Sequence, residues 1–458
     1  MAFEEVLDRF AKEAPAAVMA RATLSHVLNA ERMDSLFKRN CVKQKCGELL
    51  FSTVIDLMSL VALKIKPSVN AAYKHRLKTI NVSVAAIYDK LQGIEISVSR
   101  ALVRDTAHEF TSAVNCMTDG LAEPLLKGFE TRIVDGSLLA GTEHRIKELR
   151  RLGAATLPGR SLVVLDPDRR MVLDYIPCTD GHASECTLYP ELLETIEPNQ
   201  LWIGDRNFGT KTMLISIALD KHAFFIFRHS LGFVPKWDEV GKQQKIGPGV
   251  GGTIYEQAIS ISHQGREVRL RRITIKLSEP TRNGETEIHV LTNLPKRIRA
   301  AQVLNAYRKR WKIENVFQHV ENVLNSEIET LGYPNAALFS FGVALLMYNI
   351  LNLTKLAIAA ANKKPELADE ISTYYLALDV HGAWQGFAIA VTDKEFESVY
   401  GNLRTKQFAQ HLIRLAKMVS LKTYRKNIRG PKKPQPPKIS GNRGNHVATQ
   451  RILDESRT

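Results

Sequence analysis

The sequence has little of what marks secreted and membrane proteins. Its 458 residues include only five cysteines, an odd number that fits a reducing compartment rather than a disulfide-bonded scaffold. No signal peptide is predicted, because acids stand at Glu4 and Asp8 where an apolar stretch would be needed. The longest apolar run, residues 336–353, is interrupted by Asn349 and Asn352, whereas a membrane span needs about 20 apolar residues. We therefore expect a cytoplasmic protein without a membrane partner, in which this run is a buried helix.

Acidic residues are also scarce relative to basic ones. The chain carries 63 lysines and arginines against 48 aspartates and glutamates, which gives a formal net charge of +15. Such an excess indicates a polyanionic partner, and nucleic acid is the first candidate. Charge alone does not decide the matter, because ribosomal, membrane-surface and ordinary soluble proteins share it.

The N-terminal region predicts a helical module in which basic residues dominate. Between residues 38 and 78 there are nine lysines and arginines but only two acids, Glu48 and Asp56. We interpret residues 1–95 as a module that binds DNA ends. A dimerisation or packing domain with a solvated basic face is the alternative.

Two aspartates follow short apolar segments that have the character of strands. An Ile-Val pair precedes Asp135 and a glycine, which predicts a buried strand that ends in a turn at this aspartate. The apolar residues 201–203 lead in the same way to Asp205. Because strand and helix patterns alternate over residues 161–228, the sequence predicts a mixed α/β sheet.

Residues 306–329 predict one long amphipathic helix with polar side chains beside its apolar face. At about 100° per residue, Tyr307, Arg310, Glu314 and Glu321 fall on one narrow stripe. The adjacent apolar face consists of Ile313, Val316, Phe317, Val320 and Leu324. A carboxylate so close to the core is held rigidly, which suits a catalytic acid. Ordinary i,i+4 ion pairs on a surface helix would produce the same spacing.

The spacing Tyr307-x2-Arg310-x3-Glu314 resembles the signature Y-x2-R-x3-E-x6-K of a group of bacterial insertion-sequence DDE transposases, the insertion-sequence-4 type. The resemblance implies a ribonuclease-H-like α/β fold, a mixed sheet flanked by helices. It also implies that Asp135, Asp205 and Glu314 are catalytic and hold two Mg²⁺ ions, for which Mn²⁺ substitutes. Carboxylate oxygens are ligands that Mg²⁺ prefers, and two such ions can activate the attacking oxygen and stabilise the leaving one.

Residues around Glu314 are expected to contact DNA. The chain is basic from residue 296 to residue 312, which would tolerate a bound polyanion. The residues that we assign to DNA phosphates are Tyr307, Lys309, Arg310 and Lys312. The signature's final lysine is replaced by Glu321, and we expect this change to weaken the binding of DNA ends while the three catalytic carboxylates still function.

The order of predicted elements divides the chain into domains. The expected segments are residues 1–95 (N-terminal helical module), 120–228 and 296–380 (catalytic domain), 229–295 (inserted β-rich subdomain), 381–421 (C-terminal helical segment) and 422–458 (basic disordered tail). The insertion resembles one that the same transposases carry. Four arginines on one of its strands form what we interpret as a DNA-backbone surface, with a solvated strand face as the alternative: Arg266, Arg269, Arg271 and Arg272.

The expected function is therefore DNA transposition. The protein would cleave the ends of a mobile element and join each 3′-OH to target DNA, acting on double-stranded DNA as a homodimer in a bacterial cytoplasm, associated with the nucleoid. One alternative is a structure-specific nuclease of the same fold, which would cut without joining. The other is a catalytically silent, domesticated DNA-binding protein.

Overall fold

The computed structural model describes residues 3–44, 47–118, 123–139, 157–229, 237–281, 284–427 and 430. Contacts divide the chain into two units, Met1–Arg425 and Lys426–Thr458. All described helices and strands belong to the first unit. The predicted basic tail, residues 422–458, lies almost entirely outside the described residues.

Within the described residues, ten strands form one mixed sheet, which confirms the predicted mixed α/β class. The strands are β1 (Glu130–Leu139), β2 (Gly159–Asp166), β3 (Met171–Cys178), β4 (Gln200–Gly204), β5 (Phe224–His229), β6 (Asp238–Glu239), β7 (Gln244–Gly249), β8 (Gly252–His263), β9 (Arg266–Leu277) and β10 (Glu287–Thr292). Their order is β3-β2-β1-β4-β5-β10-β9-β8-β6, and β7 pairs with β8. The pairs β1–β4 and β4–β5 are parallel. The other strand pairs in the described sheet are antiparallel.

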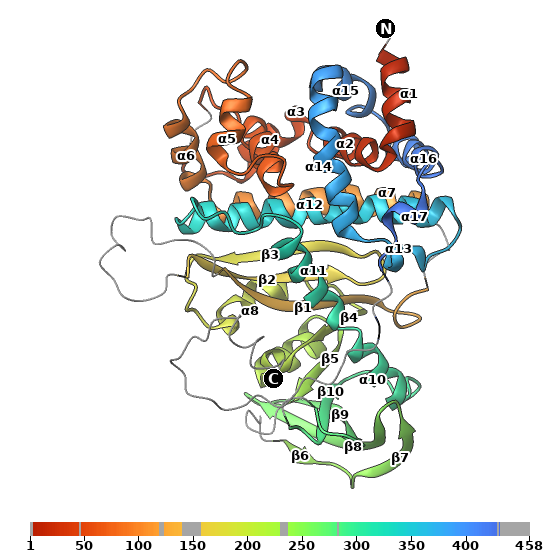
Figure 1. Cartoon of the computed structure of the whole chain (residues 1–458). Coiled ribbons are helices and arrows are strands. Elements are labelled where there is room, and N and C mark those ends of the chain that lie inside the picture. The colour runs from red at the N-terminus through yellow and green to blue at the C-terminus, as the bar shows by residue number, and fades with distance from the viewer. Residues whose placement is uncertain are drawn as a thin grey trace, which may run out of the picture. The chain divides into compact units, whose positions relative to one another are not determined.

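The β-rich residues 229–295 extend this sheet. Strand β10 pairs antiparallel with β5, placing His289 opposite His229, and β9 and β8 continue outward from β10. The expected insertion is therefore joined to the central strands by backbone hydrogen bonds (Figure 1).

Helices make up most of the rest of the first unit. Those before the sheet are α1 (Phe3–Glu13), α2 (Pro15–Val27), α3 (Ala30–Asn40), α4 (Phe51–Ala62), α5 (Val69–His75), α6 (Val84–Gly93) and α7 (Ile96–Met117). Short helices α8 (Tyr189–Glu194) and α9 (Lys211–Ile215) lie between strands, and the later ones are α10 (Ala300–Arg308), α11 (Trp311–Asn322), α12 (Pro334–Ala361), α13 (Leu367–Glu370), α14 (Thr373–Ala390), α15 (Asp393–Tyr400), α16 (Thr405–Ala416) and α17 (Leu421–Tyr424). Several of them begin where a side-chain oxygen accepts a hydrogen bond from the first turn, as at Asn29, Ser83 and Thr392.

Helices α7 and α12 lie side by side between the sheet and a layer that contains helices α1 to α6 and α14 to α16 (Figure 1). The middle of α12 is long and apolar enough to cross a membrane, but every residue of that window is buried inside the protein. The two asparagines in this helix are buried because their side chains form hydrogen bonds inside the protein. The Asn349 side chain accepts a hydrogen bond from the Val172 backbone N–H at 2.8 Å and donates to the Val172 carbonyl at 2.9 Å, while Asn352 donates to the Arg170 carbonyl. The two asparagines therefore bind the backbone of β3 and of the turn before it. Strand β3 is an edge strand of the sheet, so its outer backbone groups need such partners.

The N-terminal helices share a core with the C-terminal ones. Arg21 of α2 is 3% exposed and donates to Asp393 at the start of α15 at 2.9 Å, and Arg76 binds the same carboxylate at 2.7 Å. The His26 ring stacks on Phe408 of α16 with centroids 4.0 Å apart. Helix α2 and Arg76 thus pack against the region after residue 370, which supports a packing role for part of this module.

The interpretation of all four strand arginines as a DNA surface is wrong for Arg271. This side chain is buried, forms an ion pair with Glu256 and donates to the carbonyl groups of Leu294 and Ile298. The turn that leads into α10 therefore covers it. Arg269 is exposed, as the prediction requires.

Candidate active site

Asp135 and Asp205 extend from two neighbouring parallel strands. Strands β1 and β4 pair in register with Ile133 opposite Ile203, and each aspartate lies two residues beyond this pair. Adjacent strands are about 4.8 Å apart, so two residues at equivalent positions lie close together. Asp135 and Asp205 therefore both lie just past the same end of the parallel pairing. The structure thus brings together two residues that are 70 positions apart in the sequence.

The two aspartates differ in their local backbone. Strand β1 continues past Asp135, which pairs with Val163 of β2, so the predicted turn at this residue is wrong. The antiparallel partner β2 keeps the strand extended after the parallel pairing with β4 has ended. Strand β4 does end at Gly204, as predicted, and Asp205 caps a short 3₁₀ helix by accepting a hydrogen bond from the Asn207 N–H at 2.8 Å.

The predicted long helix over residues 306–329 is interrupted. Helix α10 ends at Arg308, α11 begins at Trp311, and α11 ends at Asn322. Between them the N–H groups of Lys309 and Arg310 bond to the carbonyl groups of Ala306 and Tyr307, three residues back, which makes a 3₁₀-type turn. Three residues per turn place Tyr307 and Arg310 directly above each other. The predicted apolar face is confirmed, since Ile313, Val316, Val320 and Leu324 are buried and Phe317 is partly buried.

Arg310 joins the two parts of the predicted site. Its Nη1 donates to Oδ2 of Asp135 at 2.6 Å, and its Nη2 donates to Oε1 of Glu314 at 2.7 Å. The Arg310 side chain is only 13% exposed. Because one guanidinium binds both carboxylates, these lie well within the roughly 10 Å beyond which they could not share a two-metal centre. The structure therefore brings Asp135 and Glu314 together across 179 positions of sequence.

The electrostatics of Asp135 reflect a crowded acidic site. The pKa of Asp135 is raised from 3.8 to about 6. Burial is the largest cause, and the nearby Asp205 and Glu185 carboxylates add to the rise, while the Arg310 guanidinium opposes it. Burial likewise raises the pKa of the Tyr307 phenol. An acid with a raised pKa next to other carboxylates needs a compensating cation, which Arg310 supplies in part.

The carboxylates have the right chemistry for a hard divalent cation, since they offer only oxygen ligands. Asp135 and Glu314 already converge on one positive group, the Arg310 guanidinium. In the described part of the chain, however, no three histidine, cysteine, aspartate or glutamate side chains stand close enough to hold one metal ion. The oxygen ligands therefore fit the cation by their chemistry, but Asp135 and Glu314 would hold one ion together only after at least one of them leaves the Arg310 guanidinium.

The remaining predicted phosphate-binding residues occupy different environments. Lys309 is exposed on the turn between α10 and α11. Lys312 is half-buried, and its Nζ donates to the Pro167 carbonyl at 3.0 Å, in the turn between β2 and β3. Burial lowers the pKa of Lys312. Glu321 is exposed near the end of α11, where burial and the neighbouring Glu327 raise its pKa.

Two residues near the carboxylates were not predicted from the sequence. Trp311 directly follows Arg310 and is 63% exposed, unusual for so large an apolar side chain. Its place one residue after the arginine of the signature could have drawn attention to it. Glu185 contributes to the raised pKa of Asp135 but comes from a 3₁₀ turn after β3, and no sequence pattern marks it.

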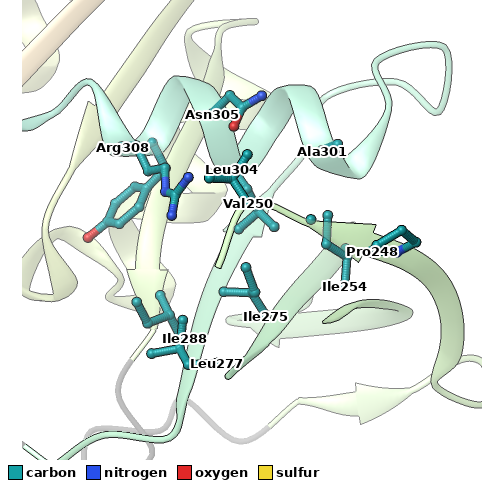
Figure 2. Close-up of a pocket in the computed structure, with 12 residues that line it drawn as sticks. Pro248, Val250, Ile254, Ile275, Leu277, Ile288, Ala301, Leu304, Asn305 and Arg308 are labelled. Carbon is teal, nitrogen blue, oxygen red and sulfur yellow. The ribbon is translucent and has the colours of Figure 1, made fainter. Parts of the chain in front are cut away.

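A mostly apolar cavity of about 360 Å³ lies beside this site, between α10 and strands β7 to β10. Figure 2 shows Leu304 of α10 above Ile254 and Ile275 of the sheet, with Asn305 and Arg308 at the helix. Tyr307 also lines the cavity, so α10, which leads into the candidate site, covers an apolar hollow on the extended part of the sheet.

Comparison with known proteins supports the predicted similarity to DDE transposases. Residues 127–350 match the family model described as Transposase DDE domain, a segment that contains Asp135, Asp205 and Glu314. No curated protein matches the chain. A similar solved structure is the cryo-EM structure of a piggyBac transposase synaptic complex with hairpin DNA; it is 9% identical, with a TM-score of 0.41, over 93% of this chain and 88% of that one. Residues 127–350 are thus similar to a transposase DDE domain, and the carboxylates around Arg310 lie within the matched segment.

Proposed function

We propose that this protein is a metal-dependent DNA transposase of the insertion-sequence-4 type, which cleaves element ends and joins the 3′-OH to target DNA. One observation supports the proposal most strongly. Asp135 and Asp205 each lie two residues after the last parallel pair of β1 and β4, and the Arg310 guanidinium binds both Asp135 and Glu314. Strands β1 to β5 form the ribonuclease-H-like core in this proposal. The match to a transposase DDE domain supports it.

Asp135, Asp205 and Glu314 would hold two Mg²⁺ ions, which when bound activate the attacking oxygen and stabilise the leaving oxygen. The strand pair fixes the two aspartates, and packing of α11 through Ile313 and Val316 fixes Glu314. Arg310, once released by these carboxylates, presents its planar fork to a phosphate group. Trp311 offers an exposed aromatic face on which an unpaired base can stack. Because two element ends must be held together, we infer a homodimer on DNA.

The proposal is tested by incubating the purified protein with a plasmid that carries the gene and its flanking DNA, in Mg²⁺ or Mn²⁺. We expect metal-dependent strand cleavage by the wild type and its loss, by roughly 10³-fold, in Asp205→Ala, since several kcal/mol of barrier reduction depend on the metals. Joined products distinguish a transposase from a nuclease that only cuts. Cleavage by Asp205→Ala at the wild-type rate would exclude the proposed site.

Lys309 and Lys312 should respond differently to replacement. Because Lys309 is exposed, Lys309→Ala is expected to weaken duplex binding and to reduce the slope of log affinity against log salt by about 0.9. Lys312→Ala should instead lower the free energy of unfolding by about 1 kcal/mol, through loss of its bond to Pro167. Fluorescence anisotropy and urea denaturation measure the two effects. Equal losses of DNA affinity in both variants would contradict this distinction.

A further inference from the structure

Glu185 is a carboxylate beside the candidate site that the proposed chemistry does not use. It begins the 3₁₀ turn Glu185–Leu188, and its side chain is 17% exposed. Its Oε1 binds Nη2 of Arg160 at 2.9 Å, and its Oε2 accepts from the Asn207 side-chain amide at 3.0 Å. Arg160 itself lies on β2 and is 12% exposed, and it also donates to the Ala183 carbonyl. Glu185 is therefore held in one position by partners on two sides.

The contact with Asn207 connects Glu185 to Asp205. The backbone N–H of Asn207 donates to Oδ1 of Asp205, and the Asn207 carbonyl accepts from the Tyr189 hydroxyl at 2.6 Å. Asn207 is thus bound through its side chain, its N–H and its carbonyl. The loop that presents the Asp205 carboxylate is fastened to the turn that contains Glu185.

On its other side Glu185 reaches the residue next to Asp135. A Cβ atom at Gly136 would come within 2.8 Å of Cδ of Glu185, closer than side chains pack. Gly136 has ordinary strand pairing with Leu162, so the glycine is explained here by the close approach of Glu185 rather than by its backbone angles. The Glu185 carboxylate therefore lies directly against the strand segment that carries Asp135.

We propose that Glu185 is a positioning residue, which sets the placement of Asp205 relative to Asp135 by holding the Asn207 amide against the strand at Gly136. This inference rests on the proposed function, because the two aspartates need a defined separation only if they share bound cations. Groups that hold metal-binding carboxylates typically affect metal affinity or activity by about 10–100-fold.

The test uses the full-length protein and Mn²⁺ alone, with free Mn²⁺ measured by electron paramagnetic resonance. Glu185→Ala is expected to weaken Mn²⁺ binding by about 10–100-fold, and Glu185→Gln by less than tenfold, because glutamine keeps an acceptor for Asn207. The control is Glu194→Gln, an exposed glutamate nearby, which should bind as the wild type does. Duplex affinity should be unchanged in all three variants. Glu185→Ala leaves Arg160 without its ion pair, so the melting temperatures of all variants are compared to detect unfolding. If the alanine variant does not fold, Mn²⁺ binding by Glu185→Gln is the test.

A double-mutant cycle gives the sharper result. Gly136→Ala should weaken Mn²⁺ binding in the wild type, since the new methyl group displaces Glu185, but should cause little further loss in Glu185→Ala. Additive losses, or wild-type Mn²⁺ binding in both Glu185 variants, would overturn the inference while leaving the proposed function intact. A wild-type protein that neither binds Mn²⁺ nor cleaves DNA would overturn both.

Discussion

Replacing Asp135 with asparagine is expected to abolish DNA cleavage and, at the same time, to stabilise the metal-free protein at neutral pH. Cleavage should fall by about 10³-fold or more, because an amide is a poor ligand for the cations on which several kcal/mol of barrier reduction depend. The free energy of unfolding should rise, because burial in an acidic site raises the pKa of Asp135 to about 6. At neutral pH the ionised carboxylate therefore destabilises the folded state. Asparagine keeps the shape and removes the charge.

The sign of the pH dependence follows from the two pKa values. The pKa of Asp135 is higher in the folded protein, about 6, than its ordinary value of 3.8, so the folded state binds the proton more tightly between them. The contribution of this group to stability is therefore lost as pH rises through that window. At pH 7 the cost is on the order of 2 kcal/mol, given that the side chain is 18% exposed.

Urea denaturation in EDTA at pH 7 and pH 5 measures this effect. Asp135→Asn should unfold at higher urea than the wild type at pH 7, and the difference should shrink at pH 5. The control is Asp238→Asn, an exposed aspartate on β6 that should change stability by less than about 0.5 kcal/mol at either pH. A variant that is less stable than the wild type at both pH values would show that Arg310 outweighs the cost of burial.

Replacing Asn349 with leucine is expected to destabilise the protein by about 2–5 kcal/mol. The Asn349 side chain is fully buried and satisfies both the N–H and the carbonyl of Val172 on the edge strand β3. Leucine has a similar volume but satisfies neither group, and each buried unpaired group costs about 1–3 kcal/mol. The loss should appear as a lower midpoint of urea denaturation.

Asn362→Leu is the matched control at the end of the same helix. Asn362 is exposed, and its side-chain amide donates to the Ile358 carbonyl, one turn back, so its replacement should cost less than about 1 kcal/mol. If Asn349→Leu were as stable as this control, the bonds to β3 would contribute nothing to holding α12 on the sheet.

Much of the candidate site could be predicted because its signals are local. Strand β4 and the aspartate after it were visible as an apolar run followed by Asp205, and the core face of α11 followed from helical periodicity. The interruption between α10 and α11 was not visible, because the change to hydrogen bonds three residues back leaves the apolar period nearly unaltered. The burial of Arg271 depends on a turn more than 20 residues later, which strand alternation does not reveal.

By itself the sequence determined which carboxylates follow strands, which arginine and glutamate lie one turn apart, and that the chain is strongly basic. These properties depend on neighbouring residues and on composition. Only the tertiary structure decided that Arg310 lies between Asp135 and Glu314, that Glu185 approaches Gly136, and that Asn349 binds the edge of the sheet. Such contacts join residues from about 50 to 180 positions apart, and they arise from strand pairing and helix packing, which no local pattern specifies.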